Sequence, residues 1–419
     1  MPKPPCGRAR QLDMFMVMAR TADPQKTAVV GAPGLRVAGL FAGIGGIELG
    51  LHRAGHRTEL LCELDAGANA VLADRFPTVA RVPDVTRLTA LPREIDLLAA
   101  GFPCQDLSQA GKTKGIEGRN SGLVTHVFRL LEKRRVPWLL LENVSFMLRL
   151  DRGQAMALVI AEIERLGYNW AYRVVDSRAF GLPQRRQRVY LIACLPEMGD
   201  PRQVLLAEDA GEPDPYPSHR GFANGFYWTE GIRGLGWATN AIPTLKGGST
   251  IGIASPPAIW MPNGDIVKPD IRDGERLQGF PTDWTAAALQ VIKPGARWKL
   301  VGNAVTVDAA EWLGRRLAHP SEYDASLDIE LTTREPWPAA AWSMGDGVRF
   351  KSGASLWPMH APIARLDSFL KFPTSPLSAR GTAGFLSRTT VSTLRFPDGF
   401  LDALKDHLAR VRGSELAAV

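Results

Sequence analysis

A thiol and a carboxyl group each follow a short apolar run of this sequence. Cys104 comes just after the run 95–100, and Glu142 comes directly after the run 137–141. If both runs are parallel strands of an open α/β sheet, both side chains lie at its carboxyl edge, where such sheets bind ligands. A thiolate is a nucleophile, and a desolvated carboxyl group keeps its proton. The two residues could therefore combine nucleophilic attack with proton donation.

The other cysteines have different surroundings. Cys62 and Cys194 lie in or at the end of apolar runs, and Cys6 lies near the amino end. A lone cysteine is more often a small buried hydrophobe than a reactive group, so Cys104 alone fits an inert role as well as a catalytic one. No Cys-x-x-Cys pair occurs, so we expect no disulfide framework, no metal site and a reducing compartment.

A glycine-rich turn, FAGIGG at Phe41–Gly46, follows the first apolar run. Glycines let the backbone pass close to a ligand without a Cβ clash, although a tight strand–helix connection would use them too. Glu48 stands where the third glycine of the Gly-x-Gly-x-x-Gly fingerprint belongs. This departure disfavours a nicotinamide-dependent oxidoreductase.

Two acidic residues follow the turn at informative places. Glu63 comes 20 residues after Gly43, at the end of the next apolar run, where a carboxylate can hold both ribose hydroxyls of a ligand. Asp84 is placed to accept a hydrogen bond from an adenine amino group. The turn and the acids together favour a pocket for S-adenosylmethionine, a methyl donor that has no phosphate.

These groups match the needs of one reaction, the methylation of cytosine at carbon 5. Addition of a thiolate at carbon 6, with proton donation to ring N3, gives an enamine whose carbon 5 can attack a methyl sulfonium. The reaction needs one nucleophile, one acid and one sulfonium donor. Cys104, Glu142 and the expected pocket supply all three.

An α/β fold would position these groups. Apolar runs alternate with amphipathic stretches, which predicts βαβ units and a Rossmann-like, mostly parallel sheet with helices on both faces. The expected strands are 35–41, 58–62, 95–100, 137–141, 172–175 and 188–194, and the expected helices include 122–131, 154–166 and 397–411. Gly167 ends the second of these helices as a C-cap glycine does.

Texture and charge divide the chain. At 1–34 we expect a flexible basic arm, or a leader without a role. A catalytic and cofactor-binding domain is expected at 35–195 and resumes at 271–318. Between its two parts we expect a loop- and strand-rich domain at 196–270. A C-terminal extension, 319–419, could extend sequence recognition, dock on a partner or brace the small domain. Residues 320–419 hold 11 Lys and Arg against 11 Asp and Glu, so the net charge of +7 lies before them.

The composition is that of a globular protein, and its positive net charge is compatible with a polyanionic partner. A sequence pI near 9.3 permits nucleic acid without proving it. No apolar run of 18 residues or secretory leader is present in the sequence, so we expect a cytoplasmic protein without a membrane association.

The motifs resemble those of the 5-methylcytosine DNA methyltransferase family, whose members are class I adenosylmethionine-dependent enzymes. Six of them occur in family order within residues 35–318: Phe41–Gly46, Pro103–Gln105, Glu142–Val144, Gln184–Arg188, Arg276–Pro281 and Gly302–Val305. The resemblance implies a DNA (cytosine-5-)-methyltransferase whose target recognition domain is 196–270. The extension 319–419 has no counterpart in the minimal family pattern.

The resemblance also implies roles for single residues. Cys104 would attack carbon 6, Glu142 would contact the N3 edge, Arg188 would hold the pyrimidine carbonyl and Arg186 would help to position backbone or base. Asn303 would tie the loop near Cys104 to the cofactor side. The cofactor-binding residues would be Phe41, Ala42, Gly43, Gly45, Gly46, Glu63, Asp84, Val85, Pro103 and Asn303.

Double-stranded DNA is the implied partner, with the target base flipped out of the helix. The expected DNA contacts are Gln105, Ser108, Lys112, Lys114, Arg119, Thr244 and Lys246. The resemblance implies a prokaryotic or phage-borne enzyme that is associated with the nucleoid. It would act on DNA as a monomer, either with a cognate restriction endonuclease or as a solitary enzyme. An RNA (tRNA) cytosine methyltransferase and a catalytically inactive DNA-binding relative remain as alternatives.

Overall fold

The computed structural model describes residues 34–102, 122–247, 256–332 and 335–417. All but the last residue of the expected basic arm, 1–34, lie outside this part of the chain. None of the described helices combines the length and the apolar composition that crossing a membrane requires. Within these residues the strands form sheets of ten, five and two strands.

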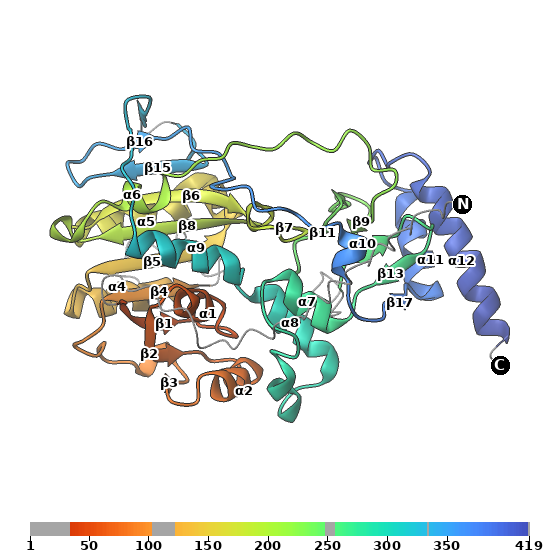
Figure 1. Cartoon of the computed structure of the whole chain (residues 1–419), viewed down its shortest axis with the longest axis horizontal. Coiled ribbons are helices and arrows are strands. Elements are labelled where there is room, and N and C mark those ends of the chain that lie inside the picture. The colour runs from red at the N-terminus through yellow and green to blue at the C-terminus, as the bar shows by residue number, and fades with distance from the viewer. Residues whose placement is uncertain (1–33, 103–121, 248–255, 333–334, 418–419) are drawn as a thin grey trace, which may run out of the picture. The chain divides into compact units, whose positions relative to one another are not determined.

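The ten-stranded sheet (Figure 1) has the order β14-β16-β15-β6-β8-β5-β4-β1-β2-β3. Its strands are β1 (Arg36–Leu40), β2 (Arg57–Cys62), β3 (Ala80–Val82), β4 (Leu97–Gly101), β5 (Trp138–Val144), β6 (Asn169–Asp176), β8 (Gln187–Cys194), β14 (Ile329–Glu330), β15 (Ala340–Ser343) and β16 (Phe350–Lys351). The first five strands in sequence, β1 to β5, are parallel to their neighbours among themselves. From the pairing of β5 with β8 outward to β14, each pair of neighbouring strands is antiparallel. Each of the six runs predicted as strands coincides with one of β1, β2, β4, β5, β6 and β8.

Helices cover both faces of this sheet, which confirms the predicted α/β class (Figure 1). Because successive residues of a strand point to opposite faces, Val37 and Ala38 of β1 belong to different hydrophobic clusters. Helices that pack with Val37 are α1 (Gly46–Arg53), α6 (Pro201–Leu205) and α9 (Val307–Ala318). Helices that pack with Ala38 are α4 (Val124–Lys133) and α5 (Gln154–Arg165).

The smaller sheets are built mainly from residues after β8. The five-stranded sheet has the order β10 (Ala238–Thr239), β9 (Asn224–Phe226), β12 (Ala258–Trp260), β13 (Ile266–Lys268) and β17 (Ser375–Pro376). The two-stranded sheet pairs β11 (Ile242–Pro243) in parallel with β7 (Gln184–Arg185). The remaining α-helices are α2 (Ala66–Arg75), α7 (Ile271–Leu277), α8 (Arg297–Asn303), α10 (Leu366–Phe369), α11 (Ala379–Thr389) and α12 (Phe400–Ala417). Short 3-10 helices occupy Val85–Arg87, Ser145–Leu148, Leu150–Gly153, Ser177–Phe180, Pro196–Met198, Ala286–Gln290 and Pro294–Ala296.

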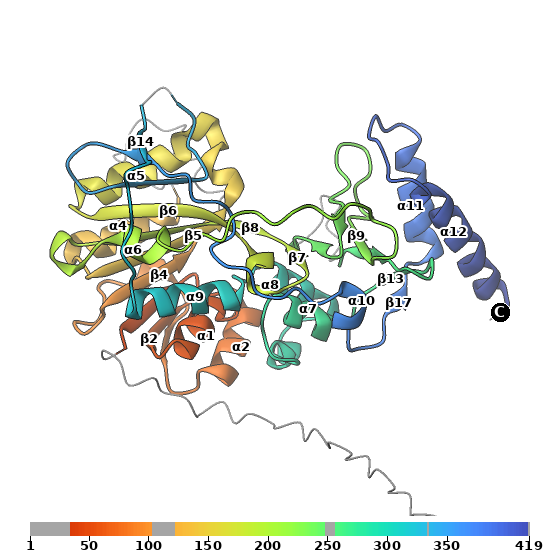
Figure 2. The same cartoon turned by 45° about the horizontal axis from the view of Figure 1, so that its top comes forward.

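The residues after α9, expected as a single extension, are divided between two sheets. β15 pairs antiparallel with β6, so β14, β15 and β16 extend the ten-stranded sheet. β17 pairs with β13 in the five-stranded sheet. α11 and α12 lie side by side (Figure 2), and their Phe385 and Phe400 pack against Phe226 of β9. The extension therefore contributes to the hydrophobic clusters of both sheets.

Candidate active site

The carboxyl ends of four parallel strands lie at one edge of the ten-stranded sheet. In register, Leu40 at the end of β1 lies opposite both Cys62 of β2 and Ala100 of β4, and Gly101 lies opposite Glu142 of β5. The glycine turn, Glu63 and the segment before Cys104 therefore leave the sheet along the same edge. This is the edge at which open α/β sheets bind ligands, next to the switch in strand order between β1 and β4.

The glycine turn is fixed by Glu63. One carboxylate oxygen of Glu63, Oε2, accepts a 2.7 Å hydrogen bond from the Gly43 backbone N–H. The other, Oε1, accepts from the backbone N–H groups of Leu64 and Asp65, each at 2.8 Å. Gly43 has a left-handed φ of 56°, and the space where its Cβ would stand is open. The turn therefore leaves room for a ligand above Gly43, beside a carboxylate of fixed orientation.

The other residues of the turn are constrained by packing. Phe41 has a φ of 54°, and the Ala42 backbone N–H donates to the Cys62 carbonyl at 3.1 Å. A Cβ at Gly45 would lie 2.5 Å from the Phe76 ring, and one at Gly46 would lie 2.5 Å from the Val305 carbonyl oxygen. These two glycines are required by close packing, whereas Gly43 faces open space.

Asp84 and Val85 lie after β3, at the start of a 3-10 turn. The Asp84 carboxylate accepts from the Thr86 backbone N–H at 2.8 Å, and this bond lowers the pKa of Asp84. Arg129 of α4 donates to the Val85 carbonyl at 3.1 Å and to the Leu88 carbonyl at 2.8 Å. Arg129, which the sequence did not single out, thus braces the segment that carries the predicted adenine acceptor.

Glu142 forms a buried ion pair with Arg188. Val144 of β5 lies opposite Arg188 of β8, which brings the guanidinium back along β5 until its Nε is 3.2 Å from Glu142 Oε1. Burial raises the pKa of Glu142, while the charges of Arg188 and Arg186 oppose that rise. The net shift is upward because desolvation outweighs the two cations. A carboxyl group in this setting is suited to hold a proton.

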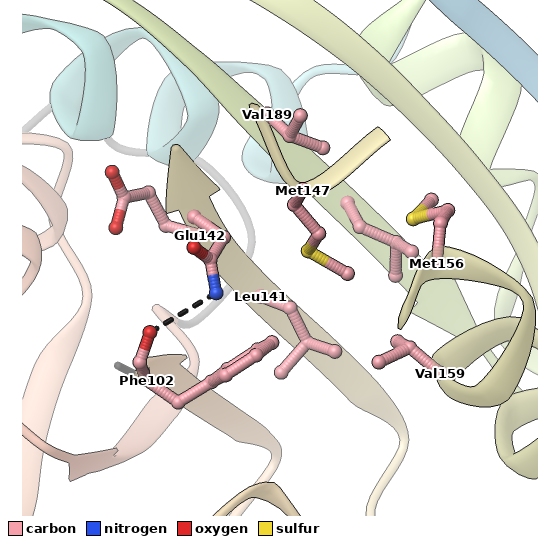
Figure 3. Close-up of a pocket in the computed structure, with 9 residues that line it drawn as sticks. Phe102, Leu141, Glu142, Met147, Met156, Val159 and Val189 are labelled. Atoms are coloured by element: carbon pink, nitrogen blue, oxygen red, sulfur yellow. Dashed lines mark hydrogen bonds between the residues drawn. The ribbon is translucent and has the colours of Figure 1, made fainter. Parts of the chain in front are cut away.

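Asn143, the residue after Glu142, connects β5 to the segment that leads to Cys104. Its Nδ2 donates to the Phe102 carbonyl at 3.0 Å, and its Oδ1 accepts from the Val144 backbone N–H at 2.8 Å. Figure 3 shows this bond beside a small cavity and the Glu142 carboxyl turned away from Met147 and Met156. The cavity is lined by Phe102, Leu141, Glu142, Asn143, Met147, Met156, Val159, Val189 and Leu191. Asn143 lies within the motif Glu142–Val144, but the sequence did not predict it as a site residue.

Arg186 contacts three backbone carbonyls. Its Nη1 donates to the carbonyls of Leu245 and Gly302, both at 3.2 Å, and its Nη2 donates to the Ala304 carbonyl at 2.6 Å. The side chain is fully buried, and burial lowers the pKa of its guanidinium. Arg186 therefore joins β7 and β8 to the motif that carries Asn303 and to the segment that follows β11.

Thr244 and Lys246, predicted to contact DNA, flank Leu245. Thr244 Oγ1 donates to the Arg185 carbonyl at 2.9 Å, so this hydroxyl is engaged within the protein. Lys246 Nζ is paired with Glu230 and lies 3.7 Å from the centre of the Tyr227 ring. The ammonium is thus exposed but held in place.

Asn303 ends α8 on an exposed position. A Cβ at Gly247 would lie 2.0 Å from Asn303 Oδ1, so the backbone at Gly247 passes directly over this amide. Cys104 and the predicted residues around it, Pro103, Gln105, Ser108, Lys112, Lys114 and Arg119, lie outside the described residues.

Comparisons with known proteins show which family the chain resembles. Residues 35–213 match the family model of the C-5 cytosine-specific DNA methylase. The chain is 50% identical to the type II methyltransferase M2.BsuMI of Bacillus subtilis over 384 residues, which cover 88% of this chain and 97% of the relative. The chain belongs to the C-5 cytosine-specific DNA methylase family.

Other similar proteins share less of the chain. The type II methyltransferase M.MspI of Moraxella sp is 35% identical over 41% of this chain and 42% of its own. The crystal structure of the S. pombe Dnmt2 methyltransferase superposes with a TM-score of 0.51 at 19% identity, covering 68% of this chain and 98% of that chain, which supports the fold. The protein is a DNA cytosine-5-methyltransferase, as its family membership and its similarity to M2.BsuMI show.

Proposed function

We propose that the protein methylates carbon 5 of a cytosine that is flipped out of a specific double-stranded DNA sequence, through a covalent bond between Cys104 Sγ and carbon 6. The buried Glu142–Arg188 pair carries this proposal, because it sets a carboxyl group whose pKa is raised by burial beside a cation at the end of β5. The Asn143 bond to the Phe102 carbonyl supports it, since Phe102 lies two residues before Cys104.

The edge of the sheet fits S-adenosylmethionine as the methyl donor. Gly43 leaves open space where a side chain would block a ligand, and Glu63 is held by three backbone N–H groups, which leave one lone pair of Oε2 to accept from a hydroxyl. Phe41, Glu63, Asp84 and Val85 would hold the donor. When bound, it supplies an electrophilic methyl group.

The protein's own groups prepare the cytosine. Proton donation from Glu142 to ring N3 and addition of the Cys104 thiolate at carbon 6 make carbon 5 nucleophilic enough to accept a methyl group. Arg188 would hold the ring carbonyl oxygen, whose negative charge grows as the thiolate adds. Loss of the carbon-5 proton to a base, return of the N3 proton to Glu142 and expulsion of the thiolate then restore the ring and free Cys104.

We further propose that the enzyme acts as a monomer on DNA and is the modification partner of a cognate restriction endonuclease. The type II relatives at 50% and 35% identity favour this role over a solitary one. The matched family is one of DNA methylases, which favours DNA over transfer RNA as the substrate.

Methyl incorporation into defined substrates tests the proposed function. The purified protein is incubated with methyl-labelled S-adenosylmethionine and either double-stranded DNA or transfer RNA, and bisulfite sequencing then locates the modified cytosines. We expect label in DNA at cytosines of one recurrent sequence. Label in transfer RNA alone, or no label in either substrate, would contradict the proposal.

A further inference from the structure

A tight loop at residues 227–235, within the expected recognition domain 196–270, lies against helix α11. The loop closes on itself through a 2.9 Å bond from the Tyr227 backbone N–H to the Leu235 carbonyl and a 2.9 Å bond from the Gly231 N–H to the Gly234 carbonyl. Its conformation is therefore defined by its own backbone. Its orientation depends on what holds it from outside.

Arg388 of α11 holds this loop by its backbone. Its Nε donates to the Glu230 carbonyl at 2.7 Å, and its Nη2 donates to the Trp228 carbonyl at 2.6 Å. The two bonds use the rigid fork of the guanidinium, which an ammonium group cannot reproduce. The half-buried side chain thus fixes two carbonyls of the loop at once.

Two more contacts from the C-terminal region support the same loop. Gly231 has a φ of 111°, and a Cβ there would lie 2.9 Å from the Phe385 ring, so backbone and ring are in direct contact. Ser392 Oγ donates to the Ile232 carbonyl at 3.1 Å. Contacts from Phe385, Arg388 and Ser392 therefore span the loop from residue 228 to residue 232.

The loop in turn positions Lys246. The Glu230 carboxylate pairs with Lys246 Nζ, which lies over the Tyr227 ring, and the Tyr227 hydroxyl donates to the Thr244 carbonyl at 2.7 Å. On its other side, Leu245 is fixed by the Gln184 side chain and Arg186. Lys246 is therefore held between the recognition loop and the catalytic domain, with 41% of its side chain exposed.

We propose that Arg388 is a positioning residue for DNA sequence recognition, which sets the Glu230–Lys246 pair to read one G·C base pair of the target. An ammonium donates to guanine O6 and N7, and a carboxylate accepts from the cytosine amino group. Guanine O6 and the cytosine amino group are neighbours within one base pair. Because the Glu230 carboxylate and the Lys246 ammonium are already in contact, they match the spacing of these two groups. This inference rests on the proposed function.

Site-resolved methylation tests this role. Wild type, Arg388→Ala, Arg388→Lys, Lys246→Ala and Glu230→Gln are incubated with a library of double-stranded DNA that varies the target sequence, and bisulfite sequencing reports which variants are methylated. We expect Arg388→Ala to raise the ratio of near-cognate to cognate methylation about tenfold. We expect sequence specificity to be lost at one G·C position of the target, and Lys246→Ala and Glu230→Gln to lose it at the same position. Arg388→Lys should reduce the specificity at this position less than Arg388→Ala does.

The matched control is Arg380→Ala, an exposed arginine on the same helix, which we expect to keep the wild-type pattern. An unchanged pattern in both Arg388 variants overturns the inference. So does a uniform loss of DNA affinity with a shallower salt dependence, which would make Arg388 a phosphate contact. Lower stability with the wild-type pattern would show a merely structural role. If Arg388→Ala does not fold, the methylation pattern of Arg388→Lys tests the inference instead. A wild type without activity on any DNA overturns the proposed function itself.

Discussion

Arg188 Nε lies 3.2 Å from Glu142 Oε1, and the two side chains are only 11% and 9% exposed. The relationship follows from antiparallel pairing, because β8 runs back along β5 and brings a residue of one motif to the carboxyl group of another. Burial and the ion pair act on Glu142 in opposite directions, and burial prevails, so the pKa of Glu142 is raised. The protonation of Glu142 therefore depends on Arg188, which would contact the same cytosine in the proposed reaction.

Replacing Arg188 should move the pH profile of methylation in a defined direction. The charge of Arg188 lowers the pKa of Glu142, so Arg188→Met raises that pKa further. Glu142 then keeps its proton to higher pH, and the alkaline fall of kcat/KM shifts upward although the maximum rate drops. Measurement of kcat/KM from pH 6 to 10 checks this. An alkaline limb that stays in place or moves to lower pH would show that Glu142 does not control it.

Glu63→Gln should weaken binding of the methyl donor. An amide keeps one acceptor oxygen, so its NH2 group would face a backbone N–H donor of Gly43, Leu64 or Asp65. The glycine turn then loses its fixed shape, and we expect the Kd for S-adenosylmethionine to rise by about tenfold or more, one lost charged hydrogen bond being about 1.5–3 kcal/mol. Calorimetric titration without DNA measures this directly. An unchanged Kd would remove Glu63 from the donor site.

Glu48 should make stability depend on pH. Its carboxyl group packs against Gly39, where a Cβ would lie 2.0 Å from Oε1, and burial raises its pKa from 4.5 to about 7. The folded chain therefore binds a proton that the unfolded chain releases between these values, so wild-type stability falls as pH rises through this window. The shift corresponds to roughly 3 kcal/mol.

Glu48→Gln removes that dependence. At pH 8 we expect the variant to be more stable than wild type by up to roughly 3 kcal/mol, with a smaller difference at pH 5. Urea unfolding at both pH values measures the difference. A variant that is less stable at pH 8 would mean that the ionised carboxylate has a stabilising partner.

The strand β15 should be required for stability of the catalytic sheet. Trp342 is buried, stacks on Phe350 with ring centres 4.4 Å apart and donates to Asp328 Oδ2 at 2.7 Å. Trp342→Ala should lower the free energy of unfolding by about 3–5 kcal/mol. Leu327→Ala, at a position that is 89% exposed, is the control and should change it by less than about 0.5 kcal/mol. Equal effects of the two substitutions would contradict the described packing.

Most of the catalytic fold was predictable because its signals are local. The apolar runs 35–41, 95–100 and 137–141, which overlap β1, β4 and β5, are continuous. Gly43, Cys104 and Glu142 follow them within four residues, so strand ends and site residues could be read together. The sequence could not show that β15 joins β6, because this strand has four residues and its partner lies about 170 residues earlier. Pairing between such distant segments leaves no periodic mark.

Roles that depend on partners were equally hidden. Arg186 and Arg188 stand two residues apart in one motif, yet Arg186 donates to three backbone carbonyls while Arg188 faces Glu142. Strand alternation would place residues two apart on the same face. Arg186 lies between β7 and β8 rather than within a strand, and only the fold shows that the two arginines have different partners. The same holds for Arg388, whose partners lie about 160 residues earlier in the chain.

Trapping on DNA that contains 5-fluorocytosine tests the central claim, covalent catalysis by Cys104, most directly. Fluorine at carbon 5 cannot leave as a proton does, so a thiolate that has added at carbon 6 stays bound to the base. With S-adenosylmethionine present, we predict a denaturant-resistant protein–DNA adduct for wild type and for Cys6→Ser, and none for Cys104→Ser. An adduct with Cys104→Ser, or none with a wild type that still methylates ordinary DNA, would contradict the account.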